Sequence, residues 1–142
     1  MNRLNIGCGF LNREKGEIGF DNNFACKPEV CGDVQDLPFK NESFDEIYSS
    51  HCLEHIPDIV KTMNECWRVL KPNGRFNIRV PLFPTTGSIS DPTHVRYFIP
   101  NTFNYFTQKG KLTGLKNVFK MNGMTIHDLT TDTQEIICQM IK

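Results

Sequence analysis

The sequence predicts an open α/β sheet that ends in an antiparallel hairpin. Three observations predict it: short strand-like segments dominate the first third of the chain, one clear amphipathic helix separates two strands, and a polar turn separates the last two strand-like segments. A length of 142 residues suits one domain with a hydrophobic core of its own. We therefore expect a single domain over residues 1–142.

Seven segments have the composition of strands. They span 4–8, 17–21, 29–34, 44–50, 74–80, 124–129 and 134–141. The first three are short apolar runs that end at or near a glycine or an acidic residue. The last two flank the polar turn 130–133, so we expect them to pair as a hairpin at an edge of the sheet.

One helix is predicted clearly, over residues 58–70. Its apolar residues lie on one face at helical spacing: Val60, Met63, Trp67 and Leu70. Lys71-Pro72-Asn73-Gly74 then supplies a cationic last turn, a proline and a glycine, which together are typical of a helix end. Weaker patterns predict helices over 100–108 and 112–121.

Two connections near the start of the chain are unusually short. Residues 9–16 and 22–28 link the first three predicted strands, and each is shorter than the dozen or so residues that a parallel crossover with a helix needs. We expect loops there, and one face of the sheet thinly covered. The segment 82–99 is by contrast long for a loop, which is typical of a functional one.

Composition excludes several classes of function. The 16 Lys+Arg balance the 16 Asp+Glu, for a net charge of 0, so no basic surface for nucleic acid or an anionic membrane is expected. Apolar runs fall short of the ~20 residues of a membrane span, and no signal peptide precedes the first strand. The six cysteines show no CxxC spacing, which favours reduced thiols and a cytoplasmic protein.

The first predicted strand ends in Gly7-Cys8-Gly9. Glycines at the carboxyl end of the first strand of such a sheet allow a ligand to approach the backbone. The dinucleotide fingerprint requires a third glycine where Asn12 stands, so a nicotinamide or flavin pyrophosphate site is disfavoured. A simple tight turn remains an alternative.

Acidic residues end the next two strands. The carboxylate of Asp21 can accept two hydrogen bonds from the vicinal hydroxyls of a ribose. The alternative is a turn-capping aspartate, followed by Asn22 and Asn23. Asp33 repeats the pattern one strand further on, where a third ring of the same ligand would fit.

Several segments, taken in order, resemble the motifs of class I S-adenosylmethionine-dependent methyltransferases, in particular the small-molecule group with D-L-P-F, S-F-D, L-E-H and R-V-L-K-P-G-G. They are LNIGCG, GFDNN, GDVQDLPFKNESFDEIYSSHCLEHIPD and NECWRVLKPNGRFNIRVP. The resemblance is dense over 4–81 and looser over 91–106, through DPTHVRYFIPNTF.

The resemblance implies a Rossmann-like, seven-stranded mixed sheet with an antiparallel last strand, and S-adenosylmethionine as cofactor. It implies cofactor-binding roles for residues at the four strand ends. Gly7, Cys8 and Gly9 would lie under the methionine part, Asp21 with Asn22 would bind the ribose, Asp33 with Val34 would meet the adenine, and Ser50 or His51 would border the methionine and the methyl group.

The chain differs from the family in three ways, as a compact variant. It begins at the first strand without the usual N-terminal helix, the helices between strands 1–2 and 2–3 are shortened to loops, and Asn73 replaces a glycine. We therefore hypothesise that a second copy covers the exposed face, as a homodimer.

The segment His51-Cys52-Leu53-Glu54-His55 fits the H-x-x-E-H pattern of inverted zinc proteases. That reading is disfavoured because the segment follows a strand and Pro57 interrupts any helix. A metal held by His51, Glu54, His55 or His94 remains open, but no metal site is predicted. Equally open is that Glu54 and His55 only secure the start of the next helix.

The resemblance makes methyl transfer the expected function, by in-line displacement onto a small or medium-sized, small-molecule or glycan-like acceptor. His51 and His94 are the candidate catalytic bases, because the pKa of histidine lies near neutrality. His55, Arg96 and Tyr97 are candidate substrate residues, the last two in a substrate loop over about 82–107. Arg96 could instead pair with Asp91.

Two alternatives remain open: an inactive S-adenosylmethionine-binding module, and a nucleotide-dependent oxidoreductase.

Overall fold

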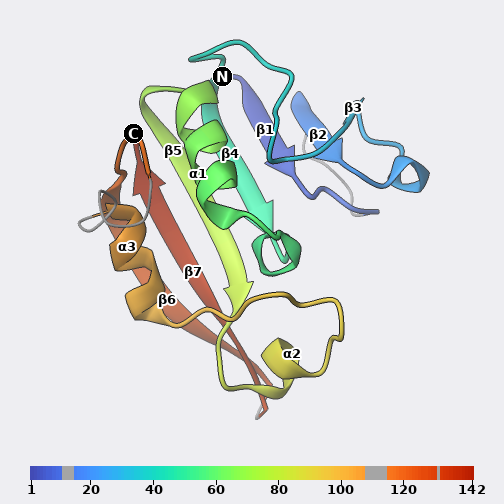
Figure 1. Ribbon diagram of the computed structural model, residues 1–142, viewed down its shortest axis with the longest axis vertical. Coiled ribbons are helices and arrows are strands. Elements are labelled where there is room, and N and C mark those ends of the chain that lie inside the picture. Colours follow the sequence, from blue (N-terminus) through green and yellow to red (C-terminus); the bar gives the residue numbers. More distant parts are fainter. Residues whose placement is uncertain (11–14, 108–114, 131) are drawn as a thin grey trace.

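A computed structural model of the chain describes residues 1–10, 15–107, 115–130 and 132–142 (Figure 1). Its strands form one sheet in the order β3-β2-β1-β4-β5-β7-β6. The strands are β1 (Arg3–Ile6), β2 (Glu17–Asp21), β3 (Val30–Cys31), β4 (Phe44–Ser50), β5 (Leu70–Pro81), β6 (Lys120–Thr130) and β7 (Thr133–Ile141). β7 is antiparallel to both of its neighbours, and the other pairs are parallel. The predicted seven-stranded mixed sheet is confirmed.

The described helices are short, apart from one of 11 residues. They are η1 (Phe24–Cys26), η2 (Leu53–His55), α1 (Ile59–Val69), α2 (Thr86–Ile89), η3 (Pro100–Phe103) and α3 (Asn104–Thr107). Between β2 and β3 the described chain forms only the short helix η1, which agrees with the predicted loop. Of the connection from β1 to β2, residues 11–14 lie outside the described part.

α1 is the long helix that the sequence predicts. Asp58 caps its start, since its side chain accepts a hydrogen bond from the amide of Lys61 at 2.9 Å. The buried face consists of Thr62, Met63, Cys66 and Val69. Val60 and Trp67 lie at the margin of the core, so the buried face is turned slightly from the predicted one.

The helix expected over 112–121 is wrong for the residues that the structure describes. Residues 115–119 are irregular, and Lys120 and Met121 already belong to β6. Leu115 and Phe119 have helical spacing and are buried, but the pairing of Met121 with Met140 draws the backbone into the sheet. Tertiary pairing here overrides a weak local pattern.

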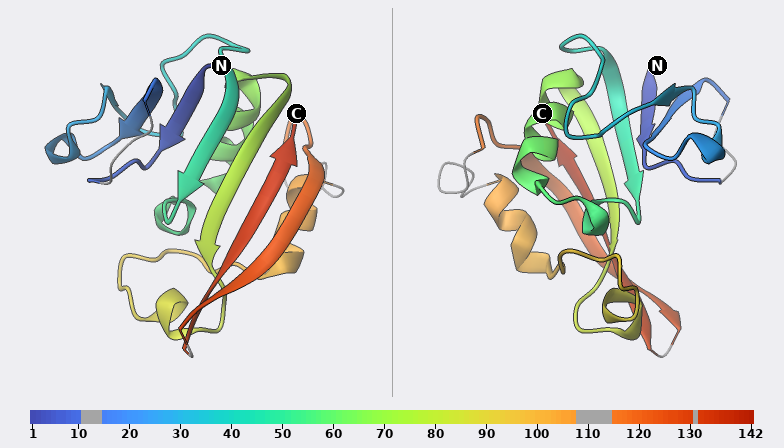
Figure 2. Two further views of the ribbon diagram at one scale, coloured as in Figure 1. Left: turned by 180° about the vertical axis from the view of Figure 1, so that it is seen from behind. Right: turned by 45° about the vertical axis from the view of Figure 1, so that its right-hand side comes forward.

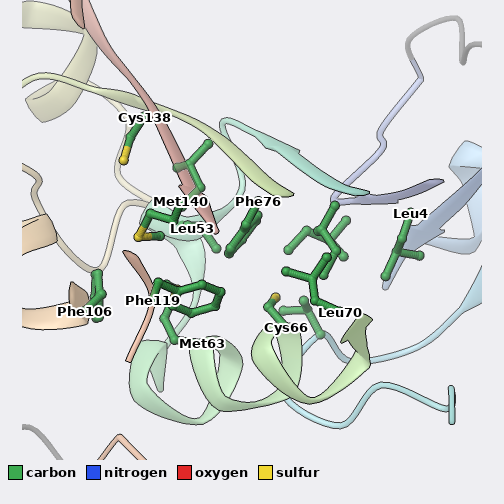
Figure 3. Close-up of a cluster of buried hydrophobic side chains, with 14 of the residues drawn as sticks. Leu4, Leu53, Met63, Cys66, Leu70, Phe76, Phe106, Phe119, Cys138 and Met140 are labelled. Atoms are coloured by element: carbon green, nitrogen blue, oxygen red, sulfur yellow. The ribbon is translucent and has the colours of Figure 1, made fainter. Parts of the chain in front are cut away.

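The core lies between the sheet and the helices α1 and α3. Figure 3 shows Met63 and Cys66 of α1 packed toward Phe76 of β5, with Phe119 beside them. All of these are at most slightly exposed. This layer fixes α1 against β4 and β5, and so fixes where the segment between β4 and α1 leaves the sheet.

The opposite face of the sheet carries no helix among the described residues (Figure 2). Its side chains form polar rows across the strands instead. Arg3 contacts Glu46 at 2.8 Å, Asn77 donates to Glu46 at 2.7 Å, and Gln139 donates to Asn77 at 2.6 Å. This face, which no described helix covers, is therefore suited to contact with water, because its polar side chains are hydrogen-bonded or ion-paired with one another.

A second copy on that face stays a prediction, which light scattering after size exclusion tests; a monomer that binds the cofactor would contradict it. Within the described part of the chain, every helix is too short or too polar to cross a membrane.

Candidate functional site

The carboxyl ends of the first four strands surround a cavity of about 700 Å³, a size typical of small-molecule sites. Eight predicted site residues line it. They are Gly7, Gly9, Asp21, Asn22, Asp33, Val34, His51 and His55. The cavity lies at the edge where open α/β sheets bind their ligands. The fold brings these residues together there from four separate segments of the chain.

The turn after β1 forms one wall. Gly7 and Gly9 have φ angles of +66° and +55°, a region that favours glycine. A Cβ on Gly7 would lie 2.5 Å from the side chain of Cys52, so the close approach of these two segments requires glycine. A Cβ on Gly9 would meet nothing within 4 Å, because Gly9 faces the open cavity.

Asp21 ends β2 with both carboxylate oxygens held by backbone amides. Gly9 donates to its Oδ2 at 2.9 Å and Asn23 to its Oδ1 at 2.8 Å. Each carboxylate oxygen can accept a further hydrogen bond. Asp21 therefore organises the turn, as a turn-capping aspartate would, and it also lines the cavity, as a ligand-binding carboxylate would.

Asp33 follows β3 and is held in a similar way. Its Oδ1 accepts from the amide of Gln35 at 2.8 Å, and the Gln35 side chain donates to both carboxylate oxygens at 3.1 and 3.0 Å. Val34 between them is buried. This wall offers an apolar side chain beside exposed polar groups, which suits a planar heterocycle.

The segment after β4 adds His51 to the cavity wall, in a left-handed backbone conformation with φ of +50°. Its Nε2 lies 3.2 Å from Oε2 of Glu135 and its Nδ1 lies 3.4 Å from Oε1 of Glu54. Both carboxylates are buried. The Glu54 carboxylate, and after it Glu135, raises the pKa of His51 above its ordinary value.

Cys52, next to His51, is not a nucleophile at neutral pH. Burial raises the pKa of its thiol to about 12, so the thiolate is scarcely populated. Cys52 serves instead as the surface on which Gly7 packs.

Five predicted site residues lie outside the cavity wall. Cys8 is only 3% exposed and belongs to the buried residues. Ser50 ends β4 but is not among the lining residues. The other three, His94, Arg96 and Tyr97, lie in the long loop after β5. Their catalytic and substrate roles stay predictions.

Arg96 secures that loop to the segment before α1. Its guanidinium donates to the carbonyl of Ile56 at 2.8 Å and to that of Pro57 at 2.7 Å. The loop is thus pinned through these carbonyls, whereas Asp91 accepts from Thr93. Tyr97 is exposed and packs on Phe83, with ring centroids 5.0 Å apart.

The sequence reasoning missed Glu135 and Gln35. Glu135 lies 84 positions from His51, so no spacing rule connects them. The available signal was an acidic residue directly before the apolar residues Ile136, Ile137 and Cys138 of β7. Gln35 follows Asp33 closely, and its position two residues after an aspartate is typical of an Asx turn.

Residues 10–78 match the methyltransferase-domain family. A sterol 24-C-methyltransferase of Schizosaccharomyces pombe is 33% identical over 81 residues, which cover 51% of this chain and 21% of that protein. A ubiquinone/menaquinone biosynthesis C-methyltransferase of Bartonella bacilliformis is 38% identical over 59 residues, 37% of this chain and 23% of that protein. The chain therefore spans less than a quarter of each of these relatives.

The solved structure of a SAM-dependent methyltransferase from Methanosarcina mazei has the same fold. It superposes with a TM-score of 0.73 at 15% identity, over 99% of this chain and 92% of that one. The order of the strands and the antiparallel β7 are consistent with the methyltransferase-domain match over residues 10–78. The chain thus has the class I S-adenosylmethionine-dependent methyltransferase fold, and its residues 10–78 match the methyltransferase-domain family.

Proposed function

We propose that this chain transfers a methyl group from S-adenosylmethionine to a small-molecule acceptor. One observation carries the proposal. The cavity at the strand ends is walled by Asp21, whose carboxylate is fixed by the Gly9 amide at 2.9 Å. A glycine turn and a fixed carboxylate on adjacent parallel strands are suited to the amino-acid part and the ribose of one nucleoside.

The residues present fit this cofactor. Gly9 leaves open space where a side chain would stand, and the cavity volume suits a ligand of this size. Asp21, with Asn22 beside it, would hold the ribose hydroxyls. Asp33 and Val34 would meet the adenine, and Gly7 and Gly9 would lie under the methionine part.

When bound, the cofactor supplies a methyl group already activated by a positively charged sulfur. The protein therefore has to align an acceptor more than to activate the methyl group. His51 is a titratable group on the cavity wall, and both of its ring nitrogens lie close to buried carboxylates. We propose that its neutral form, which carries a proton on one ring nitrogen only, takes up the acceptor proton at the other ring nitrogen.

The acceptor is proposed to be a small molecule. The two matching relatives are named for sterol and quinone substrates. The loop after β5 exposes the aromatic pair Phe83 and Tyr97, whose rings pack at a tilt with centroids 5.0 Å apart, which offers aromatic surface for an apolar or a glycan-like acceptor. The balanced charge of the chain gives no attraction for nucleic acid.

Calorimetry with S-adenosylhomocysteine and with NAD tests the cofactor. We expect binding of the former alone; binding of NAD alone would instead support the oxidoreductase alternative. Turnover of a mixed acceptor panel, read by release of S-adenosylhomocysteine, then tests the reaction. Cofactor binding without turnover on any sterol, quinone or sugar would support an inactive binding module.

The role of His51 is tested by His51→Gln. A lost base lowers kcat by a factor of about 10² to 10⁴ and leaves the affinity for S-adenosylhomocysteine nearly unchanged. His127→Gln, at an exposed position on β6, is the matched control. An unchanged kcat in His51→Gln would exclude His51 as the base.

A further inference from the structure

Three side chains with metal-binding atoms converge beside the cavity: Glu54, His55 and His94. One ligand atom from each lies within 4.8 Å of the others. Glu54 and His55 belong to η2, directly after β4, whereas His94 comes from the long loop after β5. Two backbone segments distant in sequence are thus joined at this point, and the amide of Val95 donates to the Glu54 carbonyl at 2.9 Å.

Both histidines have one ring nitrogen occupied by an acceptor. Nδ1 of His94 lies 2.8 Å from the carbonyl oxygen of Ser88. Nδ1 of His55 lies 3.0 Å from the Thr93 hydroxyl, which itself donates to Asp91 at 2.6 Å and so must accept here. Nδ1 therefore carries the proton in each ring, and Nε2 presents its lone pair. Metal-binding histidines are oriented in this way.

Glu54 supplies a second, independent observation. Its side chain is 1% exposed, and both carboxylate oxygens lack a hydrogen-bond partner among the described residues. Its Oε1 lies 3.4 Å from Nδ1 of His51, an ion-pair contact longer than most hydrogen bonds. A buried carboxylate without hydrogen bonds is costly, and a cation between it and the two imidazoles would remove that cost.

We propose that Glu54, His55 and His94 form a binding site for one divalent transition-metal ion, of the class to which zinc belongs. Two imidazoles and one carboxylate are a typical ligand set for such ions, and three protein ligands leave a position for water or another oxygen. Tetrahedral coordination needs ligand atoms about 3.3 Å apart. The three ligand atoms now lie within 4.8 Å of one another, so we infer that binding of the ion draws them closer together.

The placement gives the site a function next to the proposed one. His55 is both a ligand and a lining residue of the cavity, so the open coordination position adjoins the space that an acceptor would use. An acceptor with a hydroxyl or carbonyl oxygen suits such a position. This last step rests on the proposed methyl transfer, whereas metal binding itself does not.

The test uses the full chain, stripped of metal by a chelator and kept reduced, and titrated with Co²⁺ in the absence of S-adenosylmethionine compounds. We expect saturation at one equivalent, the visible bands of nitrogen and oxygen coordination, and displacement by Zn²⁺. His55→Gln and His94→Gln should each weaken binding at least about tenfold. His127→Gln, remote on β6, should bind as the unmodified chain does.

Three results would overturn the proposal: no saturable binding, equal affinity in His94→Gln, or a thiolate-to-cobalt band, which would assign the ion to cysteines. Glu54→Gln changes a buried group, so the folding of that variant is checked by circular dichroism. His55→Gln, at a partly exposed position, is the decisive variant. Failure to bind S-adenosylhomocysteine would contradict the proposed function but leave this result unaffected.

Discussion

The backbone amide of Gly9 donates a hydrogen bond to Oδ2 of Asp21 at 2.9 Å. This bond joins the turn after β1 to the end of β2, so that the glycine turn and the carboxylate are positioned together. The amide of Gly7 adds a bond to the carbonyl of Phe20 at 2.8 Å. The geometry of the cavity is therefore set by the backbone before any ligand enters.

Asp21→Asn should weaken the binding of S-adenosylhomocysteine by about 10- to 100-fold, because a hydrogen bond to a charged group contributes about 1.5–3 kcal/mol. Asparagine keeps the shape and one acceptor, which limits the effect on the turn. Calorimetry measures the change. Asp36→Asn is the matched control, since Asp36 is exposed and lies off the cavity wall. Equal losses in the two variants would contradict the assignment of Asp21 to the ribose.

Gly7→Ala should destabilise the fold by at least about 2 kcal/mol. The left-handed conformation alone costs an alanine about 1–2 kcal/mol, and the new Cβ would lie 2.5 Å from Cys52. Urea denaturation gives the free energy of unfolding. Gly123→Ala is the control, because a Cβ there meets nothing within 4 Å and no positive φ is required. If the two variants unfold alike, the contact between Gly7 and Cys52 is not a constraint.

The sequence predicted the strand ends better than the surroundings of the site. Glycine and acidic residues after short apolar runs placed Gly7, Gly9, Asp21 and Asp33 near strand ends, and all four line the cavity, because such strands end where the backbone must turn. The contact of His51 with Glu135 could not be predicted, since it depends on how the final hairpin inserts beside β5. The prediction of a helix over 112–121 was wrong for the same reason, because the pairing of its last residues with β7 depends on contacts outside that segment.

The residue type of Asn73, near the start of β5, anticipates its backbone conformation. Asn73 stands at the first glycine of the R-V-L-K-P-G-G motif that the chain resembles, and it adopts a φ of +62°. Asparagine is one of the few residues other than glycine that tolerate this region. The difference from the motif is therefore compatible with a left-handed backbone conformation, which the residue type alone indicates.

Arg96→Lys should loosen the loop after β5 without unfolding the chain. Lysine cannot reproduce the forked donation to the carbonyls of Ile56 and Pro57. The Val95 amide, bonded to the Glu54 carbonyl at 2.9 Å, reports on this junction. Its hydrogen exchange should accelerate about tenfold, as expected for the loss of a bond to a charged donor.

Arg75→Lys, on the polar face of the sheet, serves as the comparison for Arg96→Lys, because its guanidinium makes only a longer contact of 3.7 Å with Glu46. Exchange at Val95 should be unaffected there. Acceleration in both variants would show that the effect is global, and no acceleration in Arg96→Lys would show that other contacts hold the loop.

Glu65 gives the fold a predictable dependence on pH. Its carboxylate accepts two bonds from Arg68, at 2.8 and 2.7 Å, and one from the amide of Leu37 at 2.9 Å. The hydrogen bonds from Arg68, and then that from Leu37, lower the pKa of Glu65 below its ordinary value. Arg68 in turn donates to the carbonyls of Leu37 and Phe39, so this network fastens the segment after β3 to α1.

A carboxyl group whose pKa is lower in the folded state contributes stability above its unfolded pKa, and that stability is lost as the pH falls through the folded value. Glu65→Gln should therefore cost about 1 kcal/mol in the free energy of unfolding at neutral pH, and the difference should shrink as the pH falls below the ordinary pKa of a glutamate, about 4.3. Urea denaturation at neutral and at acid pH measures it. Glu42→Gln, at a side chain that is 52% exposed and contacts Lys142 at 3.2 Å, should change little at either pH, because Lys142 keeps its hydrogen bond to the carbonyl of Leu70. A Glu65→Gln deficit that persists undiminished in acid would mean that shape, and not the charge of the carboxylate, holds this network together.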